Sequence, residues 1–286
     1  MILVTGATGT VGSSLIAQLR DGKEPVRALV HSPQKASQIG ANVEAVVGDL
    51  DAPETLRPAM AGVRAVYAIA FFTRQIENLV DAAKRAGVKL IVRQSTIEAG
   101  ATPPFGPGKW HREQEEVIER SGLGWVHLRP TLMMTNTIQW WAWTIQNQRT
   151  VYFPGGDGRV SPVDPTDVAA VGRAVLTSDA HRGRAYEVTG PESLSIRDMV
   201  AILSRVLGGP PIQYVDIPES VAAEHMRKGG ASEELAAAMI ETLGAIRSSR
   251  YAHVADTVAR LTGRPGRTFE DWCRAHAAGF IPGGAK

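Results

Sequence analysis

Three glycines near the start of the chain are spaced for binding a phosphate group. Gly6, Gly9 and Gly12 lie in "VTGATGTVG", between a short apolar run and an amphipathic stretch. In a strand–loop–helix unit such glycines permit a tight turn, a close approach to a pyrophosphate and close packing of helix on strand. The helix N-terminus then presents free N–H groups to the phosphates. The pattern predicts a dinucleotide site, with a tight turn that binds nothing as the alternative. The other predicted contacts in this loop are Thr8, Thr10 and Val11.

The end of the second expected strand, in "RALVHSPQKA", bears on the choice of dinucleotide. An NAD site has an acidic residue here to bind the ribose hydroxyls, whereas this chain has Val30 and His31. No acid would repel a 2′-phosphate, and His31 and Lys35, with Ser32 and Arg27, are placed to contact one. The sequence therefore favours NADP(H), with NAD(H) as the alternative cofactor and an ordinary exposed lysine as the alternative for Lys35.

Two further strand ends are expected to touch the cofactor. Asp49 and Leu50 follow the third strand in "GDL" and are placed to meet the adenine. Asp49 has capping of the next helix as its alternative role. Ala70, after the fourth strand, is also assigned to the cofactor.

The elements that must position these residues alternate along the first half of the chain. Helical stretches, of which "RQIENLVDAAKRAG" is the best formed, separate six apolar runs: "MILVT", "PVRALV", "VEAVVGD", "RAVYAIA", "KLIVRQS" and "WVHLRP". Apolar strands that alternate with helices imply a parallel sheet covered on both faces. The predicted fold class is α/β, a doubly wound Rossmann sheet over residues 1–130. Residues 131–286 are expected to complete this core and to form a smaller substrate-binding lobe beside a ligand cleft.

Composition excludes several classes of function. The net charge of the 286-residue chain is +2 and no basic block stands out, so nothing favours nucleic-acid binding. The single cysteine, Cys273, permits neither an intramolecular disulfide nor a cysteine metal cluster. The start lacks the features of a signal peptide, and "IQWWAWTI" is too short to span a bilayer. We expect a cytoplasmic protein without membrane contact.

The sequence resembles the atypical short-chain dehydrogenases/reductases of the NmrA-like branch, which includes quinone, triphenylmethane-dye and azo reductases. The resemblance runs from Met1 to about Phe280 and is carried by "VTGATGTVG", "VRALVHSPQKA", "GDLDAPETL", "NLVDAAKRAGVKLIVRQST", "WHREQEEVIERSGLGWVHLRPTLMMTN" and "RTFEDWCRAHAAGF". It implies a substrate side formed after Pro130. The chain departs from the family at His31, where Arg is frequent, and in the compact "AFFTRQIENL". The residues that the resemblance places near the nicotinamide are Ser95, Thr96, Pro130 and Thr131.

One feature of orthodox short-chain dehydrogenases is missing, namely a proton-donating Tyr followed four positions later by Lys. The residues four positions after the five tyrosines are Phe71, Gly156, Gly190, Pro218 and Ala255. Reduction of a simple ketone creates a basic alkoxide, and a positioned acid speeds such a step by roughly 10²–10⁴. A quinone, conjugated enone or cationic dye delocalises or neutralises charge instead. The absence of a Tyr–Lys pair therefore argues against simple alcohol dehydrogenation and favours reduction of a conjugated acceptor.

His111 is the best candidate for a proton donor, since it lies in the segment that supplies the Tyr–Lys motif in orthodox members. A histidine with an ordinary pKa can donate or accept a proton near neutrality. Its alternative is a surface or capping histidine beside Glu115. Ser95 is the second catalytic candidate, with a strand-end hydrogen bond as its alternative. The other histidines have no partners at ligand spacing, so no metal site is predicted.

The tryptophan-rich run "QWWAWTIQ" has two interpretations. Trp140, Trp141 and Trp143 cannot all lie on one helical face, because Trp140 and Trp141 are successive. The run forms either lobe core or dimer contact, or an aromatic wall for a flat substrate. The candidate substrate contacts are Trp110, Met133, Asn136, Trp140 and Phe153.

Three functions remain open at this point. The first is an NAD(P)H-dependent reductase of a quinone-like or polycyclic aromatic compound. The second is an NADP sensor that acts through a partner protein, and the third is a non-redox dehydratase, isomerase or cyclase. A small aromatic or conjugated molecule is the expected partner, and a homodimer is a further expectation.

Overall fold

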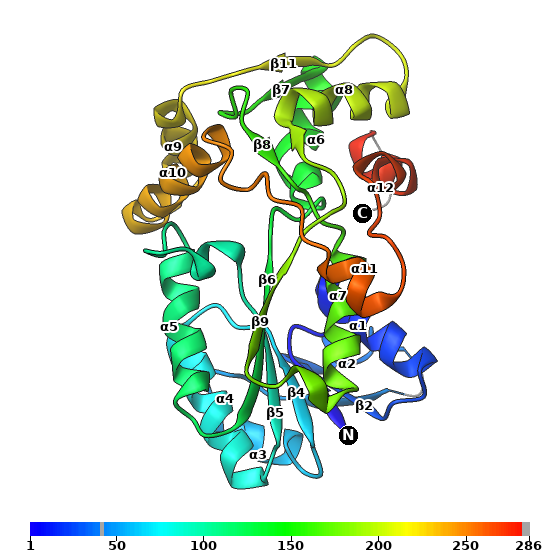
Figure 1. The fold of residues 1–286 in the computed structure, drawn as a ribbon, viewed down its shortest axis with the longest axis vertical. Coiled ribbons are helices and arrows are strands. Elements are labelled where there is room, and N and C mark those ends of the chain that lie inside the picture. Colours follow the sequence, from blue (N-terminus) through cyan, green and yellow to red (C-terminus); the bar gives the residue numbers. More distant parts are fainter. Residues whose placement is uncertain (41–42, 282–286) are drawn as a thin grey trace. The chain divides into compact units, whose positions relative to one another are not determined.

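The computed structural model describes residues 1–40 and 43–281 (Figure 1). The chain divides into two compact units. Unit 1 comprises Met1–Pro104, Gly108–Arg129 and Pro165–Glu187. Unit 2 comprises Phe105–Pro107, Pro130–Asp164 and the chain from Val188 onward.

A seven-stranded sheet forms the centre of unit 1, and its strand order is β3-β2-β1-β4-β5-β6-β9. The pairings β1–β2, β1–β4, β2–β3, β4–β5 and β5–β6 are all parallel. The strands are β1 (Ile2–Val4), β2 (Val26–Val30), β3 (Glu44–Val47), β4 (Ala65–Ala68), β5 (Leu90–Gln94), β6 (Gly124–Pro130) and β9 (Arg184–Val188). The predicted doubly wound α/β fold is confirmed. Because the strands are parallel, their carboxyl ends meet at one edge of the sheet.

Helices of unit 1 follow the predicted alternation. They are α1 (Thr10–Asp21), α2 (Pro33–Ala36), α3 (Leu56–Ala59), α4 (Thr73–Ala86), α5 (Gly108–Glu119) and α7 (Pro165–Leu176), with 3-10 turns at Pro53–Thr55, Ile97–Gly100 and Asp179–His181. The stretch between β3 and β4 forms a 3-10 turn followed by the short α3 rather than one helix. Pro58 has no N–H to bond the carbonyl of Glu54, so one continuous helix cannot form.

The apolar residues of α1 recur at helical spacing and place one face of the helix on the sheet. Its buried side chains include Val11, Leu15 and Leu19. On the same helix Gln18 Nε2 donates to the carbonyl of Thr166, 3.1 Å away, where α7 begins. This packing holds α1 against the sheet and ties its last turn to the start of α7.

Unit 2 combines short strand pairs with helices. β7 (Thr150–Tyr152) pairs in parallel with β11 (Gln213–Val215), and β8 (Arg159–Val160) pairs antiparallel with β10 (Leu194–Ser195). The helices are α6 (Asn136–Gln148), α8 (Ile196–Leu207), α9 (Glu219–Lys228), α10 (Glu233–Arg247), α11 (Thr257–Thr262) and α12 (Phe269–His276), followed by a 3-10 turn at Ala277–Phe280. Trp141 and Trp272 are fully buried. Over the described residues, no helix is both long and apolar enough to cross a membrane.

Candidate functional site

The glycine loop after β1 has the shape that a pyrophosphate site requires. Gly6 has φ +60°, in the left-handed region, and its carbonyl accepts a hydrogen bond from Gly9 N at 2.9 Å. A Cβ on Gly12 would lie 2.2 Å from the Gly6 carbonyl oxygen, so no side chain fits there. Gly9 is the N-cap of α1 and no side chain caps this end of the helix. The exposed Thr8 and Thr10 flank Gly9, so the loop fits the phosphates of a dinucleotide.

Thr5 ties this loop to the end of β4. Its hydroxyl donates to the Ile69 carbonyl at 2.8 Å and accepts from Ile69 N at 2.7 Å. Ala70, the next residue, is buried. The ends of β1 and β4 are thereby fixed at one edge of the sheet.

The four candidate contacts for a 2′-phosphate lie in or just after β2, and they differ in exposure and in hydrogen-bond partners. The His31 side chain is 74% exposed, with Nδ1 3.9 Å from Asp49 Oδ1. Lys35 is exposed, and the Ser32 hydroxyl accepts from Lys35 N at 3.3 Å. The expectation for Arg27 is wrong, because its buried guanidinium donates to the carbonyls of Ala59 and Ala61 and pairs with Glu44. The other three candidates stay available.

Asp49 and Leu50 lie where β3 leads into the turn before the 3-10 helix. Asp49 Oδ1 accepts from Asp51 N at 2.9 Å, an interaction that shapes the turn. The carbonyl of the buried Leu50 accepts from Asn78 Nδ2 at 2.8 Å. The structure thus gives Asp49 a local structural role, and its role toward adenine stays a prediction.

A buried arginine that sequence reasoning did not single out organises the end of β5. Arg93 Nη2 donates to the Ala70 carbonyl and to His111 Nδ1, each at 3.1 Å, and also to Gln114 Oε1. Its other nitrogen, Nη1, donates to the Ala68 carbonyl at 3.3 Å. Burial lowers the pKa of Arg93 to about 10, so the side chain stays a cation at neutral pH. A charged residue inside the apolar run "KLIVRQS" was the available sequence signal.

Arg93 fixes the protonation of His111. A guanidinium has only donors, so Nδ1 must accept with its lone pair and the ring proton must sit on Nε2. Burial and the neighbouring Arg93 charge lower the pKa of His111 to about 3. The expectation of an ordinary pKa is therefore wrong: at neutral pH His111 is uncharged and offers a single N–H donor.

Ser95 and Thr96 directly follow β5. The Ser95 hydroxyl is buried and has no hydrogen-bond partner of good geometry within the described residues, although it lies near enough to Glu115 to help lower the pKa of that carboxyl. Thr96 Oγ1 donates to Glu98 Oε2 at 2.8 Å. Ser95 therefore contributes to the polar surroundings of Glu115, and its role toward a ligand stays a prediction.

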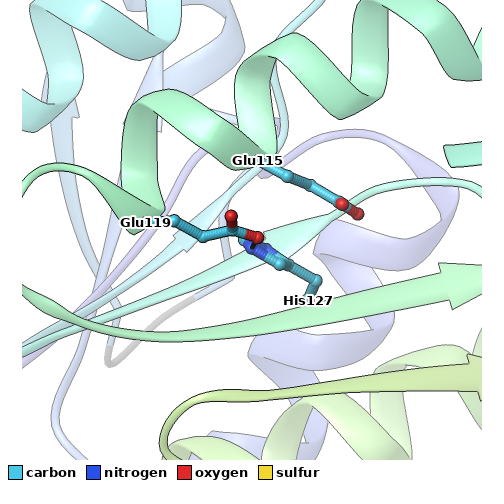
Figure 2. A group of neighbouring side chains, drawn as sticks. All are labelled: Glu115, Glu119 and His127. Atoms are coloured by element: carbon cyan, nitrogen blue, oxygen red, sulfur yellow. Dashed lines mark hydrogen bonds and ion pairs between the residues drawn. The ribbon is translucent and has the colours of Figure 1, made fainter. Parts of the chain in front are cut away.

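Glu115, Glu119 and His127 converge between α5 and β6 (Figure 2). Their ligand-type atoms lie within 4.8 Å of one another, although spacing along the chain gives no sign of the group. The Glu119 carboxylate lies 3.2 Å from His127 Nε2. Burial lowers the pKa of His127 to about 4, so its ring is neutral near pH 7.

Two arginines already neutralise this cluster. Arg129 donates to both oxygens of the fully buried Glu115, from Nε at 3.0 Å and from Nη2 at 2.6 Å. Arg112 donates to Glu115 at 2.9 Å and is ion-paired with Glu119 at 2.5 Å. Burial, the largest single influence, would raise the pKa of Glu115, but the Arg129 hydrogen bonds and charge together with His127 and Ser95 outweigh it, so the pKa is lowered. The contacts are those of a buried ion-pair network, and the prediction of no metal site stands untested.

The remaining predicted residues divide between the units. Pro130 and Thr131 belong to unit 2, where Thr131 Oγ1 donates to the Ser161 carbonyl at 2.5 Å. Trp110 lies on α5 of unit 1. Asn136 is the first residue of α6 in unit 2, and Met133 lies just before that helix. Trp140 and Phe153 stack with ring centroids 5.4 Å apart and line one cavity in unit 2.

Comparisons with known proteins agree with this geometry. A family model described as NAD(P)H-binding matches residues 6–179. An NAD(P)H azoreductase from Xenophilus azovorans is 39% identical over 285 residues, which cover 98% of this chain and 99% of that one. A (4-alkanoyl-5-oxo-2,5-dihydrofuran-3-yl)methyl phosphate reductase from Streptomyces griseus is 38% identical, covering 99% and 100%. The solved complex of the NADPH-dependent quinone oxidoreductase QOR2 from Escherichia coli with NADPH is 25% identical, with a TM-score of 0.85 and coverage of 97% and 99%.

Proposed function

The chain belongs to the NAD(P)H-binding family, as an atypical short-chain dehydrogenase/reductase of the NmrA-like branch, and we propose that it reduces conjugated, quinone-like acceptors with NADPH. It is an NAD(P)H-dependent oxidoreductase, as its relatives are. The observation that carries the choice of acceptor is the neutral His111, which stands in a chain without a Tyr–Lys pair.

The residues of unit 1 fit the cofactor. Gly6, Gly9 and Gly12 shape a loop with no room for a side chain at its tightest point, and the uncapped end of α1 faces that loop. His31 and Lys35 are exposed beyond β2 and suit a 2′-phosphate, which supports the preference for NADPH. NADPH supplies a hydride when it is bound. Ser95, Thr96, Pro130 and Thr131 are proposed for the nicotinamide end, and Ala70 is proposed as a further cofactor contact.

His111 acts as a hydrogen-bond donor rather than as a general acid. With its pKa lowered to about 3, the imidazolium form is scarce near neutrality, and Nε2–H is the donor that remains. A neutral imidazole held in one tautomer stabilises a developing negative charge without transferring its proton. This help suffices when the acceptor itself spreads the charge, as a quinone or enone does. A saturated ketone needs a proton in the transition state, which neither a Tyr–Lys pair nor the neutral His111 would supply.

The acceptor is proposed to be flat and conjugated. The relatives include proteins named for azo compounds, quinones and an unsaturated furanone, which share conjugation rather than a functional group. The proposed substrate contacts are Trp110, Met133, Asn136, Trp140 and Phe153.

The test is anaerobic consumption of NADPH or NADH with a panel of quinones, conjugated enones, azo dyes and cationic dyes. The expected result is oxidation of NADPH with at least the quinones, faster than oxidation of NADH at equal concentration. Tight NADPH binding without turnover on any member of the panel would contradict the proposal. It would favour the sensor, or, if products were isomeric or dehydrated, the non-redox enzyme.

A further inference from the structure

A cavity of about 680 Å³ lies wholly within unit 2. It opens among α6, the segment after β7, α9 and α10, all of which are labelled in Figure 1. Small-molecule sites have volumes of about 300–1,000 Å³. Six of its lining residues carry the argument, namely Trp140, Trp143, Tyr152, Phe153, Met226 and Met239.

Aromatic rings dominate the wall and keep exposed surface. The exposed fractions are 66% for Trp143, 44% for Tyr152 and 37% for Trp140. Trp140 stacks on Phe153, with an angle of 28° between the rings, so one indole face is already oriented. Large exposed aromatic side chains gathered around one hollow are costly in water and mark a binding site.

The chemistry of the lining selects the ligand. No Asp, Glu, Lys or Arg lines the cavity among the described residues, so a localised charge would find no counter-ion in its wall. Ring faces and thioethers bind flat unsaturated molecules, and methionines adapt to their outline. Thr144, Gln148 and His225 add polar groups suited to an oxygen at a ring edge. The lining fits an uncharged, planar, fused-ring molecule with polar substituents.

Ion pairs and close backbone contacts fix the walls before any ligand arrives. Arg247, at the end of α10, donates to Glu219 at 2.7 Å where α9 begins and to Asp216 at 2.9 Å. A Cβ on Gly158 would lie 2.0 Å from the Ile246 carbonyl oxygen, so the segment after β7 is held directly against α10. The Phe153 carbonyl accepts from Tyr214 at 3.1 Å. A preformed site spares a ligand the cost of ordering it.

From these observations we propose that this cavity is where the acceptor's fused aromatic ring system binds, stacked on Trp140 and Trp143. The inference rests on the proposed reductase function for the identity of its ligand. The selectivity of the cavity follows from its lining in unit 2. Because that lining has no Lys or Arg over the part of the chain that the structure describes, an uncharged naphthoquinone binds, whereas a sulfonated naphthoquinone of the same ring size binds poorly.

The experiment measures binding and turnover separately on the full-length protein. Binding of naphthoquinone without cofactor is followed by quenching of tryptophan fluorescence and by calorimetry, for the unmodified chain, Trp143→Ala and the cavity-filling Thr144→Trp. Trp143→Ala is expected to weaken binding about two- to tenfold, as the loss of one aromatic stack does, and Thr144→Trp to abolish it. Leu235→Ala, an exposed α10 position outside the lining, is the matched control and leaves the affinity unchanged.

Turnover with NADPH distinguishes the claim that the acceptor binds in this cavity from the claim that the protein is a reductase. The expected result is a KM for naphthoquinone that rises in Trp143→Ala with kcat retained. Unchanged binding and unchanged KM in both cavity variants would overturn the cavity assignment while the reductase stands. Cavity-dependent binding with no turnover on any acceptor would leave the cavity as a ligand site and defeat the reductase.

Discussion

Arg93 Nη2 lies 3.1 Å from His111 Nδ1, so a buried cation faces the ring nitrogen that must stay unprotonated. The pair joins β5 to α5 and leaves Nε2–H as the one donor of the imidazole. In the proposed mechanism, His111 therefore stabilises charge but does not give up a proton. On that proposal, a reductase without the Tyr–Lys pair acts on acceptors that delocalise charge.

Removing the His111 ring tests that role. His111→Ala is expected to lower kcat with naphthoquinone by about 10²-fold, the typical cost of losing one donor to a developing oxyanion. His111→Gln keeps an N–H donor and should recover part of the loss. Steady-state kinetics of the three proteins provide the measurement. Equal kcat in His111→Ala and the parent would remove His111 from the mechanism.

The pH profile offers a second check on His111. Because its pKa is lowered to about 3, its ring stays neutral between pH 5 and 9 and contributes no inflection to kcat in that range. The ¹⁵N chemical shifts of His111 should report the Nε2–H tautomer throughout. An inflection near pH 6.5 that disappears in His111→Gln would show that the imidazolium takes part.

Acid should destabilise the fold through its buried histidines. The folded-state pKa values of His111 and His127, lowered to about 3 and about 4, lie below the ordinary value of about 6.5. The unfolded chain therefore binds these protons first, and the free energy of unfolding falls as pH drops from about 6.5 to about 4. Each histidine contributes up to about 1.4 kcal/mol per pH unit. Urea unfolding at several pH values measures the slope, which His127→Gln should reduce; an unaltered slope would contradict the account.

The glycine loop should tolerate no side chain at its tightest point. Gly12→Ala places a methyl group 2.2 Å from the Gly6 carbonyl oxygen, so the loop must shift and NADPH should bind more than about tenfold more weakly. Gly244→Ala is the matched control, since nothing lies within 4 Å of its added Cβ. It sits in α10 and should stabilise the helix by about 0.5–1 kcal/mol. Unchanged NADPH affinity in Gly12→Ala would exclude this loop as the phosphate site.

The network in Figure 2 should be structural and independent of metal. Glu115→Gln removes the carboxylate paired with Arg129 and one of the carboxylates paired with Arg112, and it should cost about 3–5 kcal/mol of unfolding free energy, the usual cost of breaking a buried ion pair. Dialysis against a chelator should change neither activity nor melting temperature. A lower melting temperature after chelation, restored by one divalent metal, would instead make Glu115, Glu119 and His127 a metal site.

The parts of this account that were predictable from sequence are local in the chain. Gly6, Gly9 and Gly12 lie within seven residues, and each apolar strand of the sheet is one continuous run, so spacing alone reveals them. The network around Glu115 was not predictable, because it joins a helix to the next strand and needs the fold to bring His127 close. The aromatic cavity draws on residues from Trp140 to Ile246, of which the sequence pointed only to the run around Trp140 and to Phe153.

The roles of Arg93 and His111 were also beyond sequence. A histidine early in a helix gives no sign of its pKa, which depends on burial and on a cation 18 positions away in another element. For Arg27 the sequence predicted a phosphate contact that the structure does not support. Its guanidinium donates to the backbone carbonyls of Ala59 and Ala61 instead. For both His111 and Arg27, the role depends on where the side chain points and what surrounds it, which residue type alone does not reveal.

The most direct test of the central claim compares two bicyclic acceptors that differ mainly in conjugation. The purified protein is given NADPH and either 1,4-naphthoquinone or 2-tetralone, whose carbonyl is not conjugated with the ring, under anaerobic conditions, and kcat/KM is determined for each. We expect turnover of the quinone and at least about 10²-fold lower kcat/KM for the ketone, since the sequence has no Tyr–Lys pair and His111 is neutral. Comparable reduction of tetralone would contradict the account, because it would require an acid that the neutral His111 does not provide.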